Sequence, residues 1–222
     1  MAEPFFIDFH THYINNSEGV LSILNINLGN NEKWNKDFKA CSIGIHPWNI
    51  DTKNIVQHFF ELEDFTKEPN VIAVGEVGLD KSIETPLILQ TKVLEQQIEI
   101  ANHYNKPVII HCVRAFSELI ALKKKMKPHV PFIIHGFNKN LNVLEDLLKN
   151  DFYISLGAAL LQSNSYAATA IKSIPREKLF LETDSKEVLI QGIYLAAVDI
   201  LDIDLNILKK TLFENLSNIK KW

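Results

Sequence analysis

The amino-acid sequence predicts an α/β fold in which parallel strands alternate with helices and close into a TIM-like (β/α) barrel. Short apolar or β-branched runs alternate along the chain with longer stretches of helical periodicity. Most of the short runs are apolar on both faces, as in parallel strands that helices cover. Five of the runs end in side chains that can bind a metal. A barrel would gather these ends at one mouth, whereas an open sheet would spread them along a line.

The first half of the chain contains four predicted strands and two predicted helices. Helical periodicity predicts one helix over 54–65. A second helix opens at Thr85-Pro86, because threonine caps free amides and proline is tolerated at the first helical position, and it runs to about Tyr104. The predicted strands cover 4–8, 20–26, 40–45 and 70–79.

The second half continues the same alternation of strands and helices. Its predicted strands cover 107–112, 131–136, 152–157 and 178–183, and its helices cover 115–126, 140–149 and 166–173, with two more helical segments at the end. The chain has no low-complexity segment and no Gly/Ser-rich linker. We therefore expect a single domain over 1–222.

The composition is that of an ordinary globular protein, with 46% hydrophobic residues, a net charge of −4 and a pI near 6.1. This balance excludes a strongly basic protein that coats nucleic acid, but not a nuclease whose substrate is held by metals. Cys41 and Cys112 are far apart, so neither a disulfide framework nor a zinc knuckle is indicated.

The same features predict a cytoplasmic protein without a membrane partner. The first 13 residues lack the basic and apolar regions of a signal peptide. No run approaches the roughly 20 apolar residues that span a bilayer. No obligate protein partner is evident from the sequence.

The stretch FIDFHTHY, residues 6–13, places two histidines directly after the first predicted strand. In a strand, residues i and i+2 point to the same side, so His10 and His12 can ligate one ion together. Alone, the HxH pattern is only suggestive of a metal site.

Four further strands end in residues of the same kind, which are Glu76, His111, His135 and Asp184. Each alone has a structural explanation. A histidine after a strand is usually a hydrogen-bonded structural residue, Glu76 could be a buried salt-bridge partner, and Asp184 could cap the next helix. Charged groups are rarely buried unless they are paired or bound to metal. Four histidines and two acids at five strand ends therefore predict a site for two divalent ions.

Three other histidines are interpreted differently. His46, in GIHPW, follows a strand and is expected to line the mouth of the barrel. It has no carboxylate or histidine neighbour at ligand spacing, so we interpret it as a substrate contact and not as a metal ligand. His58 and His103 fall in predicted helices and are expected at the surface.

Taken together, the motifs resemble the TatD-type metal-dependent hydrolases of the amidohydrolase-like barrel superfamily. The matching stretches run in family order over nearly the whole chain. They are FIDFHTH, GIHPW, AVGEVGLD, QTKVLEQQIEIANHYNKPVIIHC, IIHGF, YISLG, LFLETD and, faintly, ENLSNIKKW.

This resemblance implies a two-metal mouth and a division of roles among the residues. Family members are typically nucleases, often 3′-to-5′ exonucleases on DNA, that use magnesium, manganese or zinc. The mixed nitrogen and oxygen ligands also suit iron or nickel. By position, the first ion would be held by His10, His12 and Asp184, and the second by His111 and His135. Glu76 would bridge the ions, Asp184 would be the general base, and Asp8 and Asp80 would orient the ligands.

The sequence departs from the family pattern in four places. Only 33 residues lie between His12 and His46, where the family has about two βα units, so one or more outer helices should be missing. Trp48 replaces a histidine, and Arg114 follows His111 by three positions instead of two. After LETD, SKEVLIQG stands in place of Ala-Pro and an arginine-rich loop.

We expect hydrolysis of an ester bond, namely a phosphodiester in single-stranded DNA or in another substrate. Arg114 and His46 would grip a phosphate, and Trp48 would either stack on a base or pack at the rim. The main alternative is a small-molecule amidohydrolase, lactonase or phosphotriesterase-like enzyme, which the acidic balance and the missing arginine loop favour. A non-enzymatic scaffold is a further alternative, but the presence of all six ligands argues against it.

Overall fold

The computed structural model describes residues 5–13, 17–30, 32 and 34–220. These residues contain eight parallel strands, which follow one another in the sheet in their order along the chain. The strands are β1 (Phe6–Thr11), β2 (Val20–Asn27), β3 (Cys41–Gly44), β4 (Val71–Asp80), β5 (Val108–Val113), β6 (Phe132–Ile134), β7 (Phe152–Leu156) and β8 (Leu179–Leu181). This is the strand order of a TIM-like (β/α) barrel, so the predicted fold class is confirmed.

Helices alternate with the strands from β3 onward. They are α1 (Ile55–Thr66), α2 (Leu87–His103), α3 (Phe116–Met126), α4 (Leu141–Lys149), α5 (Tyr166–Ala170), α6 (Ile190–Leu201) and α7 (Leu205–Ile219). Short 3₁₀ turns occur as well, including η1 (Pro47–Asn49). The described residues between β1 and β2, and between β2 and β3, form no helix. The predicted loss of outer helices near the N-terminus is therefore confirmed.

The chain divides into two compact units. The first unit comprises residues 1–24 and 134–221, and the second comprises 25–133 and 222. The single domain predicted over 1–222 stays a prediction. No helix among the described residues is both long enough and apolar enough to span a membrane.

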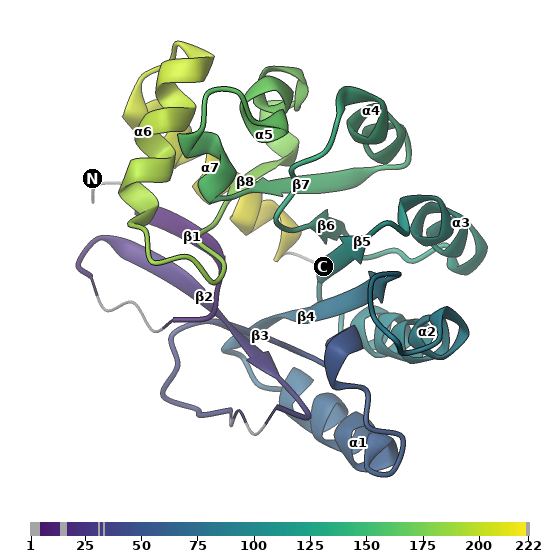
Figure 1. The fold of residues 1–222 in the computed structure, drawn as a ribbon. Coiled ribbons are helices and arrows are strands. Elements are labelled where there is room, and N and C mark those ends of the chain that lie inside the picture. Colours follow the sequence, from purple (N-terminus) through teal and green to yellow (C-terminus); the bar gives the residue numbers. More distant parts are fainter. Residues whose placement is uncertain (1–4, 14–16, 31, 33, 221–222) are drawn as a thin grey trace. The chain divides into compact units, whose positions relative to one another are not determined.

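The first unit pairs β7 with β8 and joins the end of β8 to β1. Helices α6 and α7 pack beside β1 and β8 (Figure 1). The Tyr194 hydroxyl of α6 accepts a 2.9 Å hydrogen bond from the Ile7 amide and donates one to the Ile7 carbonyl. The rings of Phe9 and Phe180 stack at 4.0 Å between β1 and β8. These contacts fix the strand that carries the HxH pair.

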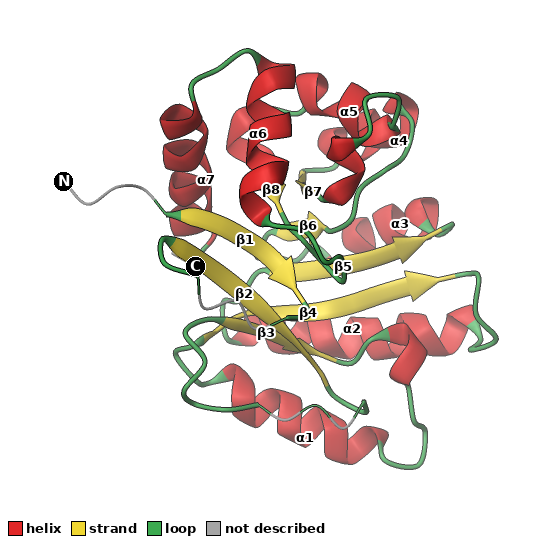
Figure 2. Ribbon diagram, turned by 60° about the vertical axis from the view of Figure 1, so that its left-hand side comes forward, coloured by secondary structure: helices red, strands yellow, loops and turns green. Residues whose placement is uncertain are grey.

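The second unit holds β3, β4 and β5, and α1 and α2 lie on one side of β3 and β4 (Figure 2). The side-chain amides of two glutamines of α2 hydrogen-bond the backbone at the carboxyl ends of β3 and β4. Gln97 bonds both polar groups of Ile45, and Gln90 bonds both polar groups of Asp80. Gly78 lets β4 approach β5, since a Cβ there would lie 1.8 Å from the carbonyl oxygen of His111.

Two strand boundaries differ from the prediction in ways that matter for the site. The strand predicted over 4–8 continues to Thr11, so His10 lies inside β1 and does not follow it. The strand predicted over 70–79 continues to Asp80 and is buried throughout, so Glu76 lies inside β4 and does not end it.

Candidate metal centre

The first unit brings four of the predicted metal ligands together. One side-chain donor atom each of His10, His135 and Asp184 lies within 4.8 Å of the others. The Nε2 atoms of His10 and His12 lie 3.8 Å and 3.5 Å from the same oxygen, Oδ1 of Asp184. The His10 ring is 5.2 Å from that of His12 and 4.5 Å from that of His135, measured between centroids. The i, i+2 geometry predicted for the HxH pair is therefore present.

Backbone hydrogen bonds fix the position of Asp184. Its amide donates to the carbonyl of His10 at 2.9 Å, and its carbonyl accepts from the amide of His12 at 3.1 Å. Its φ of 53° lies in the left-handed region, which aspartate tolerates better than most residues. Leu189, not Asp184, is the N-cap of α6, so the capping explanation of Asp184 does not hold.

Glu182 is a residue of this cluster that the sequence reasoning missed. It is fully buried, accepts a 2.5 Å hydrogen bond from the Gly136 amide and a short one from the Ser155 hydroxyl, and lies 3.4 Å from Nδ1 of His135. Burial raises the pKa of Glu182, but the neighbouring His135 and His10 outweigh it and leave the pKa below its usual value. Its ionised carboxylate therefore orients the His135 ring.

Asp8 acts on the cluster through Thr183. Its carboxylate accepts hydrogen bonds from the Thr183 amide and hydroxyl, each at 2.8 Å. Burial raises the pKa of Asp8 to about 7 in spite of these hydrogen bonds. Asp8 thus fixes the position of Thr183, which lies between Glu182 and Asp184 in the chain.

The second unit forms another group, built from His46, Glu76 and His111. Oε1 of Glu76 lies 3.1 Å from Nε2 of His46 and 2.8 Å from Nδ1 of His111. The two imidazole rings are 4.5 Å apart, and one donor atom from each of the three residues lies within 4.8 Å of the others. His46 is 5% exposed and lies within reach of both partners, so it can contribute a nitrogen to this group, and its expected role as a substrate contact stays a prediction.

Asp80 supports this second group. Its Oδ2 atom lies 3.2 Å from Nε2 of His111 and accepts a 2.7 Å hydrogen bond from Nε1 of Trp48. Burial raises the pKa of Asp80, but hydrogen bonds from Ser82, Trp48 and His111 outweigh it and lower the pKa to about 2. The ionised carboxylate can therefore fix the orientation of the His111 ring.

The other two expected substrate contacts, Trp48 and Arg114, follow strands β3 and β5 of the second unit. Trp48 is 64% exposed in the η1 turn, and its ring meets the His46 ring edge to face at 5.1 Å. Arg114 is exposed directly after β5, with a left-handed φ of 55°.

The donor atoms of both groups fit a divalent transition-metal ion. Each group combines imidazole nitrogens with one carboxylate, and neutral imidazole is the commonest protein ligand for such ions. The acids beside His111 and His135 fix ring orientation, as the outer partners of metal-binding histidines do. Either group can therefore hold a metal ion.

Comparison with known proteins agrees with this chemistry. A 3′-5′ ssDNA/RNA exonuclease TatD of Edwardsiella piscicida is 30% identical over 69% of this chain and 60% of its own. A metal-dependent hydrolase of Bacillus subtilis, YabD, is 30% identical over 67% of this chain and 59% of its own. The chain thus spans about three fifths of the length of these curated relatives.

A solved structure and a family model are similar to a larger share of the chain than these relatives are. The crystal structure of YJJV, a TatD homologue from Escherichia coli K12, covers 99% of this chain and 98% of its own with a TM-score of 0.80 at 20% identity. The family model for TatD related DNase matches residues 21–187, which is most of the sequence. The chain therefore belongs to the TatD related DNase family.

Proposed function

We propose that the chain is a divalent-metal-dependent phosphodiesterase that acts on single-stranded nucleic acid. The observation that carries this proposal is the pair of histidine–carboxylate groups, one in each unit. The relatives support the substrate class, because one is named an ssDNA/RNA exonuclease and another, from Homo sapiens, a 3′-5′ RNA nuclease.

We assign one ion to each group. The first would be held by His10, His12, His135 and Asp184, and the second by His46, Glu76 and His111. Zinc, manganese, iron and nickel suit these mixed ligands, and magnesium is the further candidate that the family suggests. Bound divalent ions would polarise the phosphoryl oxygens and lower the pKa of a water molecule.

Asp184 is our candidate for the general base. Its side chain is 30% exposed, so its carboxylate can reach a water molecule and accept the proton that the water loses. Its backbone bonds to β1 hold the carboxylate beside two imidazoles without using the carboxylate itself. Glu182 would position His135, and Asp80 would position His111, so both histidines present a fixed nitrogen.

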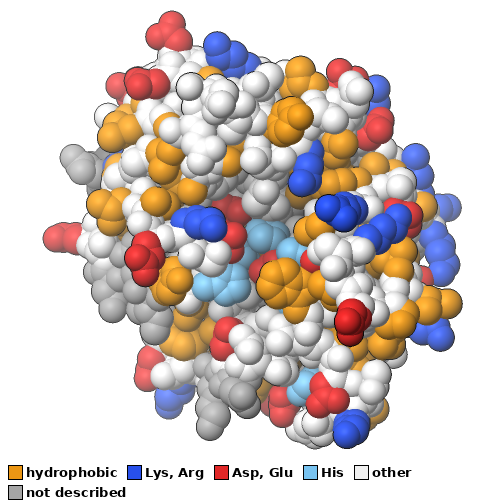
Figure 3. Space-filling view, in the orientation of Figure 1, with side chains coloured by type: hydrophobic (Ala, Val, Ile, Leu, Met, Phe, Trp, Pro, Cys, Tyr) orange, Lys and Arg blue, Asp and Glu red, His pale blue; other side chains and the backbone are white. Residues whose placement is uncertain are grey.

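The exposed Trp48 and Arg114 would hold the nucleic acid. Aromatic rings stack on any base, and the guanidinium can contact a phosphate through two parallel hydrogen bonds. On the face shown in Figure 3, lysine and arginine side chains lie in small groups among acidic ones. Binding to this face would therefore depend on a few specific contacts more than on a broad basic surface.

The sequence also supports an alternative function, hydrolysis of small neutral substrates. SKEVLIQG after Asp184 lacks the arginines that would hold a polyanion, and the net charge is −4. Both features favour a small neutral substrate such as an amide, a lactone or a phosphotriester. We expect a cytoplasmic location in either case.

A substrate panel separates the two functions. The chain is stripped of metal, supplied with manganese, zinc or magnesium, and assayed on single-stranded DNA, single-stranded RNA, amides, lactones and phosphotriesters. The proposal predicts that mononucleotides are released from an oligonucleotide. Turnover confined to the small neutral substrates would replace it with the alternative.

A further inference from the structure

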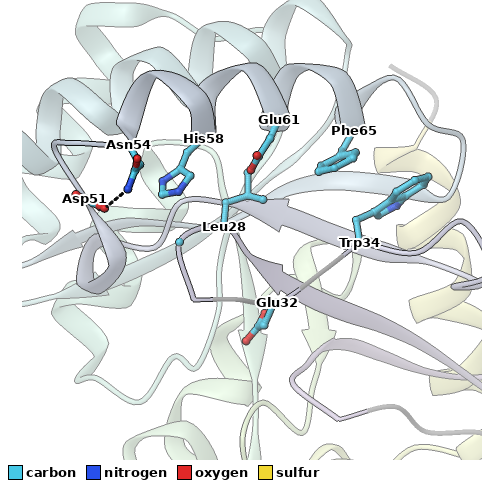
Figure 4. Close-up of a pocket in the computed structure, with 9 residues that line it drawn as sticks. Leu28, Glu32, Trp34, Asp51, Asn54, His58, Glu61 and Phe65 are labelled. Carbon is cyan, nitrogen blue, oxygen red and sulfur yellow. Dashed lines mark hydrogen bonds between the residues drawn. The ribbon is translucent and has the colours of Figure 1, made fainter.

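A cavity of about 570 Å³ in the second unit plays no part in the proposed reaction. It lies between helix α1 and the segment that follows β2 (Figure 4). Its volume falls within the roughly 300–1,000 Å³ of sites that hold small molecules. The side chains that matter here are those of Trp34, Asp51, Asn54, His58, Glu61 and Phe65.

The missing outer helix explains why this cavity exists. Helix α1 buries Leu62 and Thr66. A flank of α1 beside these residues carries His58, Glu61 and Phe65, which point toward Leu28 and Trp34 in Figure 4. Asn54, directly before the helix, turns its amide to Asp51. In a complete barrel a neighbouring helix would cover such a flank. Here the described residues between β2 and β3 form no helix, and the flank borders the cavity.

The cavity combines a flat aromatic wall with negative charge. The rings of Trp34 and Phe65 stack 5.2 Å apart at 25°. Asp51, Glu61 and Glu32 contribute carboxylates, and none of the described lining residues is lysine or arginine. The lining therefore favours a cation with a flat apolar body, and it disfavours anions such as nucleotides.

His58 adds a hydrogen-bond acceptor or donor within the wall. The sequence predicts it as a helix surface residue, but its Nδ1 atom is buried and has no hydrogen-bond partner among the described residues. Gly29 keeps this end open, because a Cβ there would lie 3.2 Å from Cε1 of His58 and 2.8 Å from the carbonyl oxygen of Asn49. The unpartnered nitrogen is a polar group that a ligand can satisfy.

We propose that this cavity binds a small planar organic cation, of the amidinium, guanidinium or aromatic-amine class. The cationic head would meet the carboxylate of Glu61, which lies one helical turn from Phe65 on α1, and the flat body would pack against the Trp34–Phe65 wall. Asp51 lies at the other end of the lining and would add only a longer-range attraction. This site is separate from the metal-binding residues and does not depend on the proposed hydrolase activity.

Three probes of the same shape and different charge test the proposal. Benzamidine is cationic, benzamide is neutral, and benzoate is anionic. Each is titrated into the full chain, and binding is followed by calorimetry and by backbone amide NMR shifts. Benzamidine should bind saturably, benzamide about tenfold more weakly, and benzoate not at all, since only the first satisfies the carboxylates. Equal binding of benzamidine and benzamide, or no saturable binding of benzamidine, would overturn the proposal.

Variants then locate the site. Glu61→Gln should weaken benzamidine binding about three- to tenfold, Asp51→Asn should weaken it less, and Trp34→Leu should weaken both benzamidine and benzamide. Glu63→Gln is the matched control, because Glu63 lies two positions from Glu61 on α1 but lines a different groove, which faces α2. The NMR shifts should centre on His58, Glu61 and Phe65. Shifts elsewhere, or equal effects of Glu61→Gln and Glu63→Gln, would place the ligand outside this cavity and refute the assignment.

Discussion

The backbone amide of Asp184 donates a 2.9 Å hydrogen bond to the carbonyl of His10. This bond ties the chain after β8 to β1, and it brings a carboxylate from late in the sequence to the HxH pair near its start. Because the bond is made by the main chain, the Asp184 side chain stays available for an ion and a water molecule. A substitution at position 184 can therefore change the chemistry of the side chain while the backbone bond to His10 keeps its position.

Replacing Asp184 by asparagine tests its role as base. Asp184→Asn keeps the backbone bonds but cannot accept a proton, so kcat should fall by about 10²- to 10⁴-fold. The thermal unfolding midpoint should change by only a few degrees. Asp199→Asn changes an exposed aspartate of α6 in the same way and should leave kcat unchanged. Turnover close to that of the parent would remove Asp184 as the base.

Glu182→Gln tests the residue that positions His135. Loss of the charge beside Nδ1 of His135 should weaken metal binding about 10- to 100-fold, as expected for outer partners of metal ligands. It should also lower the free energy of unfolding by about 1–3 kcal/mol, because the Gly136 and Ser155 donors lose part of their acceptor. Metal titration and urea unfolding measure the two effects.

The exposed Glu177→Gln serves as the control for this change. A loss of stability in Glu182→Gln with unchanged metal affinity would show that Glu182 supports the fold alone.

Two substitutions at Trp48 separate its ring from its N–H group. Trp48→Phe keeps an aromatic face but loses the hydrogen bond to Asp80. Trp48→Leu loses both. If the ring stacks on a base, KM for an oligonucleotide should rise about tenfold or more in Trp48→Leu and much less in Trp48→Phe. KM values for both variants equal to that of the parent, measured at saturating metal, would assign Trp48 to packing at the rim.

Burial of Asp8 predicts a dependence of stability on pH. Its pKa is about 7 in the folded chain, against an ordinary value of 3.8. The folded chain therefore binds this proton more tightly than the unfolded chain does. Folding therefore takes up protons between about pH 4 and 7, and the Asp8 contribution to stability falls as pH rises through that window, by up to about 4 kcal/mol.

Urea unfolding of the metal-free chain and of Asp8→Asn at several pH values isolates this contribution from that of the histidines. The variant should gain stability relative to the parent as pH rises. A constant difference between the two proteins would show that Asp8 does not carry a raised pKa.

Sequence periodicity predicted the helices well and the polar strand ends less well. The helix expected over 54–65 is found at Ile55–Thr66, because amphipathic spacing is local information. The strand expected over 4–8 reaches Thr11, because the end of β8 pairs with it at Asp184. That partner lies more than 170 residues away and leaves no local pattern.

The candidate site was also predicted only in part, because contacts between residues on different strands leave no local pattern. Strand-end histidines and acids stand out against apolar runs, so the sequence could propose six candidate ligands, and their role stays a prediction. His46 was interpreted as a substrate contact because Glu76 and His111, its neighbours in space, lie on other strands. Glu182 was missed because it was counted with the strand in LFLETD. Its i, i+2 spacing from Asp184 is the signal that would have identified it.

The most direct test of the account is hydrolysis of single-stranded DNA while manganese is titrated into the metal-stripped chain. We predict no mononucleotide release without metal, a rise in rate that levels off at about two ions per chain, and abolition by a chelator. Release that persists in the chelator, or no release with any divalent ion, would contradict the claim that these histidine and carboxylate groups form the centre of a metal-dependent nuclease.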